Sequence, residues 1–345
     1  MADDLELQAA HDDMDGVPPP QATRESVGHR DARRELAQAL DSGRLHHAWL
    51  LQGPRGIGKA TVAFDFARTV LAHGGRDGEA VFRQVALGSH PNLLHLTRPA
   101  AERGPGFRTQ ITVDEVRRLN RFFQSTPGEG AYRVAIVDPV DDMNRSAANA
   151  LLKMLEEPPT KALFLIVNHS AGRLLPTIRS RCRMLRFAPL PPSDLLAALE
   201  TVLPGHSAQE RARAAELGQG SVRRAVAMLE NGGLEIATRL EAVLAPERPD
   251  WNQIQALADA LTAKGREAGY DLLLESLLQA IAGESERLLS AGQKASAARL
   301  AAYHASESER LRVAAAYNLD RRQAVLTLVA GLFEARSGTR ATLAH

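Results

Sequence analysis

The chain has 345 residues, of which 44% are hydrophobic, so it is long enough for two or three domains that each bury a core. Its 42 Lys and Arg residues nearly cancel its 41 Asp and Glu residues, and the formal charge of +1 gives no global attraction to nucleic acid. The single cysteine, Cys182, excludes an internal disulfide and a multi-cysteine zinc site. No apolar run reaches the roughly 18 residues of a membrane span, so we expect a cytoplasmic protein.

The N-terminal segment, residues 1–25, is acidic and contains Pro18, Pro19 and Pro20 in a row. Such a composition buries too little apolar surface to offset the entropy of ordering. The segment also lacks the basic and apolar regions of a secretory signal. We expect a flexible acidic leader.

Helix and strand patterns alternate through the next part of the chain. Apolar residues recur at helical spacing over 30–40, 60–72, 113–124 and 146–157, the last stopped by Pro158 and Pro159. Short apolar runs, which predict strands, lie at 46–52, 90–98, 132–138 and 162–168. This alternation predicts an α/β domain with a parallel sheet over residues 26–188.

Strand signals vanish after residue 188, and the rest of the chain is rich in Ala and Leu at helical spacing. Glycine- or proline-containing breaks occur at 218–221, 231–233 and 245–250. We place a small helical domain at 189–240 and a larger helical domain at 241–345.

Residues 53–59 fit the first seven positions of the phosphate-loop motif G-x-x-x-x-G-K-[ST], between a predicted strand and a predicted helix. Gly53, Gly56 and Gly58 would let backbone N–H groups turn toward an anion. Lys59 would reach the terminal phosphates of a nucleotide.

Two departures argue against hydrolysis at this loop. Ala60 stands where a hydroxyl normally binds magnesium, and Thr61 projects about 100° further round the helix. Asp138 ends a buried strand, where P-loop enzymes keep a metal-associated carboxylate, but Pro139 follows where a water-activating carboxylate is needed. ATP or ADP held weakly without hydrolysis, and a purely structural loop, both remain open.

Five blocks of sequence resemble the AAA+ subunits of bacterial clamp loaders. In chain order they are HHAWLLQGPRGIGKAT, GSHPNLLHL, NRSAANALLKMLEEPP, ALFLIVN and LLPTIRSRC. Weaker signals are GQGSVRRAVAML and NLDRRQAVLTLVAGL. The resemblance implies a RecA-like domain, a helical lid and a C-terminal helical collar that closes a hetero-pentameric ring.

Within that family, motor subunits have an intact phosphate loop and commonly a four-cysteine zinc module. The corresponding segment here offers His73 and His90 but no cysteine, so we expect no metal. The departures are similar to those of the stationary, non-hydrolysing member of the ring. Its partners would be the motor subunits and a delta-like subunit, with the sliding clamp and primed DNA engaged through the complex.

The resemblance also implies roles for three residues. Arg181, in the triplet Ser180-Arg181-Cys182, matches the arginine finger that acts in trans on a neighbour's ATP, a role that suits a planar, permanent cation. Asn168 and Arg223 match the sensor-1 and sensor-2 positions, where they would contact a bound nucleotide. Their alternatives are a polar strand cap and a solvated helix face.

Two other functions stay open. The chain could be an active ATPase motor subunit that uses Lys59, Thr61 and Asp138, or a tether in which Arg181 has no chemical role. We find no set of metal-binding carboxylates for nucleotidyl transfer. Polymerase chemistry would therefore belong to the DNA polymerase III holoenzyme, a nucleotidyltransferase, and not to this chain.

Overall fold

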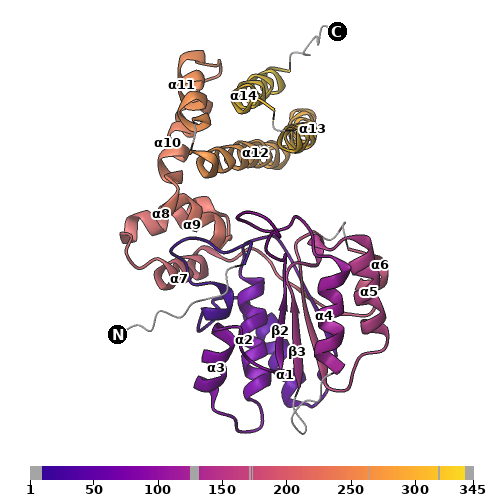
Figure 1. Ribbon diagram of the computed structural model, residues 1–345. Coiled ribbons are helices and arrows are strands. Elements are labelled where there is room, and N and C mark those ends of the chain that lie inside the picture. Colours follow the sequence, from indigo (N-terminus) through magenta and orange to yellow (C-terminus); the bar gives the residue numbers. More distant parts are fainter. Residues whose placement is uncertain are drawn as a thin grey trace. The chain divides into compact units, whose positions relative to one another are not determined.

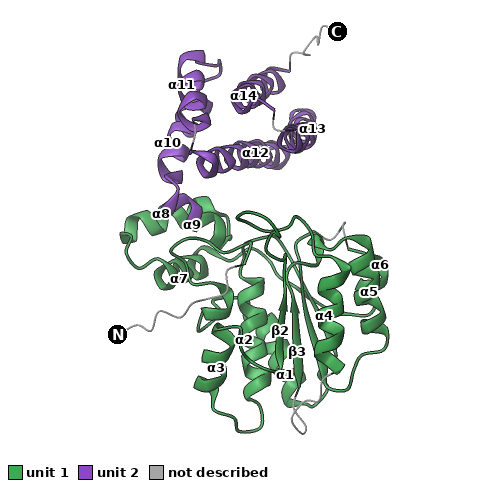
Figure 2. Cartoon of the chain, viewed as in Figure 1, with its two compact units in different colours: residues 1–225 green, residues 226–345 purple. Residues whose placement is uncertain are grey.

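The computed structural model describes residues 10–124, 132–170, 172, 174–263, 265–317 and 319–338. The chain divides into two compact units, the first ending at Ala225 and the second beginning at Val226 (Figure 2). Within the described ranges, none of the helices combines the length and the apolar character that a membrane crossing needs.

The first unit is built on a parallel sheet of five strands in the described residues, in the order β2-β3-β4-β1-β5 (Figure 1). The strands are β1 (Ala48–Gln52), β2 (Leu93–Leu96), β3 (Arg133–Val137), β4 (Ala162–Asn168) and β5 (Arg183–Arg186). Central β1 pairs with β4 on one side and with β5 on the other. This order confirms the predicted parallel α/β class and is that of an AAA+ RecA-like domain.

Alternate residues of each strand enter two separate cores, because successive side chains in a strand point to opposite faces. In β1, Trp49 and Leu51 pack under α1 (Arg30–Asp41), α2 (Lys59–Ala72) and α3 (Gly78–Ala86). Ala48 and Leu50 face the other core, under α4 (Val113–Gln124), α5 (Arg145–Glu156) and α6 (Pro176–Arg179). Figure 1 shows these two helical layers on either side of the strands.

Three elements were missed by the sequence prediction. Helix α3, which follows the glycines near residue 75, is not among the predicted helices, and Asp77 caps it by accepting from the N–H of Glu79. Helix α6 and strand β5 have only four residues each. Elements this short carry too little periodicity to be detected.

Residues 10–25, which we expected to be part of a flexible leader, contact the rest of the first unit. These residues form defined contacts in place of a flexible segment, including a 3-10 helix at Pro20–Ala22. Buried Arg68 of α2 donates to the carbonyl of Arg24 at 2.9 Å, and the Arg24 guanidinium lies over the Phe82 ring of α3, 4.5 Å from its centroid. Contacts of this segment with α2 and α3 thus offset the entropic cost of ordering a segment that is poor in apolar residues. Residues 1–9 lie outside the described residues.

The helices α7 (Pro192–Val202), α8 (Ala208–Gly218) and α9 (Val222–Glu230) follow the sheet. Ser207 and Glu210 form a capping box that starts α8. The predicted 189–240 domain covers these helices, whereas the division into compact units falls inside α9, after Ala225. The domain boundaries at 188 and 240 therefore stay a prediction.

The second unit is helical over its described residues. It contains α10 (Gly233–Leu244), α11 (Trp251–Thr262), α12 (Glu267–Ser290), α13 (Lys294–Ala316) and α14 (Arg321–Ser337). Helix α13 packs against α12 and α14, and Tyr303 donates its hydroxyl hydrogen to the Leu328 carbonyl at 2.7 Å. Arg336 forms a bidentate pair with Glu284 and also donates to the Leu244 carbonyl. These contacts tie α14 to α12 and α10.

Candidate functional site

The phosphate loop lies at the carboxyl end of β1 and leads directly into α2. Gly56 and Gly58 adopt φ values of +78° and +96°, which L side chains rarely tolerate. A Cβ at Gly56 would lie 2.5 Å from Cβ of Arg223, so the loop also needs glycine for close packing against the start of α9. At Gly53, which follows β1, a Cβ would lie 2.3 Å from the Phe187 carbonyl oxygen. All three predicted glycines therefore shape the loop.

Lys59 is the first residue of α2, and its ammonium group is turned back onto its own loop. The Nζ atom donates to the carbonyls of Gly53 at 2.7 Å and Pro54 at 2.5 Å. Burial lowers the Lys59 pKa to about 8 although the nearby carboxylates of Asp138 and Asp141 favour the charged form. The lysine is thus engaged in holding the loop in this state.

The residue after Lys59 is Ala60, so the last position of the phosphate-loop motif lacks a hydroxyl group. Ala60 and Thr61 lie in the first turn of α2, and Thr61 is half-buried. Because successive residues of a helix are rotated by about 100°, the Thr61 hydroxyl does not occupy the position of a hydroxyl at residue 60. Weak magnesium binding at this loop stays a prediction.

Asp138 follows β3 and faces the same edge of the sheet. Its side chain is 15% exposed, and its Oδ2 lies 4.0 Å from Nε2 of His95. Burial and the negative charge of Asp12 raise the Asp138 pKa to about 7, against the opposing effect of Lys59. This carboxyl group is therefore only about half ionised near pH 7.

Asn168, the last residue of β4, is fully buried. Its Nδ2 donates to Oδ2 of Asp141 at 3.2 Å, and the same carboxylate accepts from the N–H groups of His169 and Ser170. Asp141 thus caps the end of β4 instead of standing free as a base. Asn168, the residue at the sensor-1 position, is therefore hydrogen-bonded to Asp141 at the end of β4.

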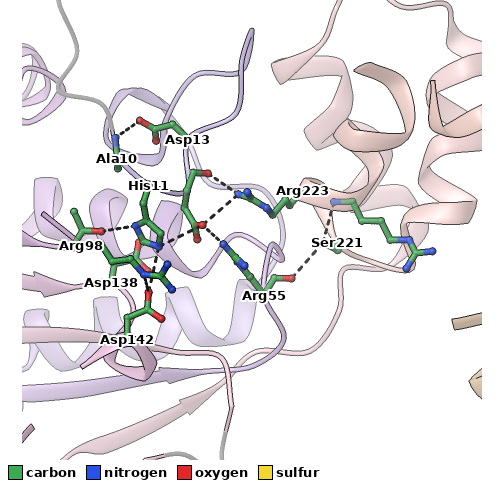
Figure 3. Close-up of polar contacts among 12 residues, drawn as sticks. Ala10, His11, Asp13, Arg55, Arg98, Asp138, Asp142, Ser221 and Arg223 are labelled. Atoms are coloured by element: carbon green, nitrogen blue, oxygen red, sulfur yellow. Dashed lines mark hydrogen bonds and ion pairs between the residues drawn. The ribbon is translucent and has the colours of Figure 1, made fainter. Parts of the chain in front are cut away.

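Arg223 lies at the start of α9, and its backbone N–H donates to the Gly56 carbonyl at 3.2 Å. Its Nη1 donates to the Asp12 carbonyl at 2.6 Å and lies 3.9 Å from the Asp12 carboxylate. The structure therefore brings the predicted sensor-2 residue to the phosphate loop. It also brings Asp12, which sequence reasoning had left in the leader. Figure 3 shows Arg223 and Arg55 at this loop.

His29 is a second residue that sequence reasoning missed. Its Nε2 lies 2.6 Å from the Ile57 carbonyl of the phosphate loop, and since a carbonyl can only accept, Nε2 must carry the hydrogen. The ring packs against Phe187 at 4.7 Å between centroids. Burial and the charge of Lys59 keep the His29 pKa below its ordinary value, which favours the neutral ring. His29 therefore buttresses the loop.

Arg181 is the one predicted site residue that the fold places elsewhere. It precedes β5, which runs parallel to β1 with Arg183 beside Trp49. The phosphate loop follows the other end of β1, so the two sites lie at opposite edges of the sheet, separated by the length of β1, about 16 Å. Arg181 therefore cannot serve the nucleotide site of its own chain without a large rearrangement.

The Arg181 side chain is 35% exposed and held by local contacts. Its Nη2 lies 2.6 Å from Oε1 of Glu156, and its Nη1 donates to the Thr177 carbonyl at 3.1 Å. Burial raises the pKa of neighbouring Cys182 to about 12, so its thiol is not a nucleophile near neutral pH.

Among the described residues, no group of three or more His, Cys, Asp or Glu side chains is placed to hold a metal ion. The expectation that no zinc is bound stays a prediction.

A parallel sheet in the order 2-3-4-1-5, a phosphate loop after the central strand, an aspartate after a neighbouring strand and an adjoining helical lid define an AAA+ subunit. A family model described as "DNA polymerase III, delta subunit" matches residues 28–191. The delta-prime subunit of Pseudomonas aeruginosa DNA polymerase III is 34% identical over 60% of this chain and 66% of its own length. The chain is therefore similar to clamp-loader-related subunits of DNA polymerase III, a delta-prime subunit among them.

Other similar proteins belong to the same system. The tau subunit of Escherichia coli DNA polymerase III is 28% identical over 77% of this chain and 42% of its own length. A solved gamma subunit-related protein of Thermotoga maritima covers 89% of this chain and 99% of its own, at 18% identity and a TM-score of 0.42. The chain thus spans less than half of the tau relative and about two thirds of the delta-prime relative.

Proposed function

We propose that this chain is a non-hydrolysing, delta-prime-like subunit of a bacterial sliding-clamp loader in the cytoplasm. It would support ATP-dependent clamp loading by supplying Arg181 to ATP bound on a neighbouring subunit. Motor subunits and a delta-like subunit would complete the hetero-pentamer, and the clamp and primed DNA would be engaged through the assembly.

The observation that carries this proposal is the position of Arg181. The guanidinium lies about one strand length from the chain's own phosphate loop, at the opposite edge of the sheet. It is partly exposed, and its carboxylate partner, Glu156, is 42% exposed. An exposed pair of this kind contributes only about 0–1 kcal/mol, so a more strongly charged partner such as a γ-phosphate can replace it.

The chain's own loop supports the second half of the proposal. Ala60 removes the magnesium-binding hydroxyl, Pro139 removes the water-activating carboxylate, and Lys59 is engaged by the loop's carbonyls. Each change weakens a different step of hydrolysis. ATP or ADP could still bind weakly at Lys59, with Asn168 and Arg223 nearby, without being turned over.

The test is the DNA-stimulated ATPase activity of a reconstituted loader that contains its motor subunits and clamp. Arg181→Ala should lower activity by an order of magnitude or more, because arginine fingers contribute about 10³ to 10⁵ in related GTPase systems. Arg181→Lys should restore little, since an ammonium lacks the planar fork of a guanidinium. Arg179→Ala removes the same charge from the same stretch and should leave activity near wild type.

Equal assembly of all variants must be confirmed first by size-exclusion chromatography. If Arg181→Ala and wild type support equal ATPase activity, the finger is excluded and a structural tether becomes the better function. Turnover by the isolated wild-type chain would instead identify an active ATPase motor subunit.

A further inference from the structure

The segment formed by residues 10–13 lies against the chain's own nucleotide site. Asp12 and His11 contact residues from the phosphate loop, the lid and the loop after β3. Figure 3 shows His11 beside Arg98 and Asp142. Asp12 is separated by 43 residues from Arg55 and by 211 residues from Arg223. These contacts therefore depend on the tertiary fold and not on nearness in the sequence.

Asp12 supplies the negative charge. Its carboxylate is ion-paired with Arg55 of the phosphate loop and lies 3.9 Å from Arg223 at the start of α9. Its backbone carbonyl also accepts from Arg223 at 2.6 Å. Although burial opposes ionisation, the hydrogen bond and charge of Arg55 and the charge of Arg223 lower the Asp12 pKa, which keeps the carboxylate ionised.

His11 anchors the same segment on its other side. Its Nδ1 lies 3.0 Å from the Thr97 hydroxyl, and its Nε2 lies 3.4 Å from Oδ2 of Asp142. Arg98 also bonds to the Asp142 carboxylate, with Nε 2.5 Å from Oδ2. The imidazole side chain is 8% exposed. Residues 11 and 12 are therefore held from two sides by elements that surround the site.

The ionised Asp12 carboxylate lies between Arg55 of the phosphate loop and Arg223 of the lid. It thus pairs with two cations that would otherwise be available to an anionic ligand. The neighbouring Lys59 is satisfied by the carbonyls of Gly53 and Pro54. Arg55, Arg223 and Lys59 thus each have a partner from this chain. A nucleotide would have to displace Asp12 from Arg55 and Arg223 to use them.

We propose that residues 10–13 are a self-ligand of the phosphate loop, in which the Asp12 carboxylate takes the place of a nucleotide phosphate and closes the site. Nucleotide binding then requires the segment to leave. The apparent dissociation constant is raised by the inverse of the open fraction, so a site open in 1–10% of molecules binds about 10- to 100-fold more weakly than an unobstructed one.

Fluorescent ADP (an N-methylanthraniloyl derivative) titrated into the isolated full chain, with and without Mg²⁺, measures this effect. Asp12→Asn removes the charge but keeps the shape and the Arg223–carbonyl bond, and should bind the probe at least threefold more tightly than wild type. A chain of residues 14–345 removes the whole self-ligand and should bind at least tenfold more tightly. Lys59→Ala in that shortened chain should abolish the gain.

Asp15→Asn is the matched control. It removes one carboxylate three residues beyond Asp12, outside residues 10–13, and Asp15 is exposed. Its affinity should equal that of wild type, and thermal unfolding should show that every variant is folded. Equal affinity of wild type, Asp12→Asn and the shortened chain, or binding by none of them, would overturn the proposal. This test uses only the chain's own loop, so its outcome is independent of whether Arg181 acts on a neighbour.

Discussion

Arg181 and Glu156 form an ion pair between the loop before β5 and the last residue of α5, with Nη2 2.6 Å from Oε1. The arginine proposed to act on another subunit is therefore held by its own chain when no neighbour is present. Under the proposed function, assembly would exchange Glu156 for the neighbour's phosphate.

Glu156→Gln should leave the free energy of unfolding within about 1 kcal/mol of wild type, because exposed ion pairs contribute little. It should also leave the ATPase activity of the reconstituted loader at or above the wild-type level, since Arg181 is then released. Urea unfolding and the ATPase assay measure the two effects. An ATPase as low as that of Arg181→Ala would mean that Glu156 positions the arginine in the assembly.

Gly56→Ala should destabilise the first unit more than Gly43→Ala. Both glycines have positive φ, +78° and +66°, so both substitutions strain the backbone by about 1–2 kcal/mol. Only at Gly56 does the new Cβ meet other atoms, 2.5 Å from Cβ of Arg223 and 2.6 Å from the Ser221 hydroxyl. We expect an additional loss of about 1–3 kcal/mol, seen as a lower urea midpoint by circular dichroism. Equal midpoints would show that the loop and α9 are not tightly packed in solution.

Asp138 should make stability depend on pH between about pH 4 and pH 7. The folded chain keeps the Asp138 proton up to its raised pKa of about 7, whereas the unfolded chain loses it near the ordinary value of about 4. Protonated Asp138 contributes its full amount to the free energy of unfolding below the pKa of the unfolded chain. This contribution is lost as the pH rises through the pKa of the folded chain. Wild type should therefore lose about 3–4 kcal/mol relative to Asp138→Asn across this range, measured by urea unfolding. A difference that does not change with pH would contradict the raised pKa.

Cys182 should react slowly with iodoacetamide in the folded chain. Burial raises its pKa to about 12, so the reactive thiolate is scarce at pH 8. We expect alkylation at least ~100-fold slower than in urea-unfolded chain, where the thiol has its ordinary pKa. Because Cys182 is the chain's only cysteine, mass spectrometry of the intact protein reports it without ambiguity. Equal rates would show that the loop carrying Arg181 opens freely.

Much of the first unit could be predicted from the sequence because its strands are continuous apolar runs and its loop follows a spaced motif. The run at 162–168 coincides with β4, and the helix stopped by Pro158 ends as α5 at Glu156. The contacts of Asp12, His11 and Glu156 could not be predicted. They depend on the tertiary path of the chain, and each residue's local surroundings indicate only a solvated acid or a polar segment.

Helix α3 had a signal that could have found it. Asp77 followed by Gly78 and Glu79 is a helix start with an acidic first turn, but the glycines before it favoured a loop. His29 offered no such signal, because its role depends on a left-handed backbone, with φ of +50°, that turns the ring toward the phosphate loop. Local conformations of this kind are set by packing after the chain has folded.

Strands β1 and β5 run side by side from Trp49 beside Arg183 to Gln52 beside Arg186. The Arg183 guanidinium also lies over the Trp49 ring, 4.8 Å from its centroid. Backbone hydrogen bonds fix the register of these two strands, so the phosphate loop after β1 and the Arg181 loop before β5 are attached to opposite ends of one strand pair. A displacement of the loop after β1 would be passed to the Arg181 loop through this strand pair, whether or not the chain itself hydrolyses a nucleotide.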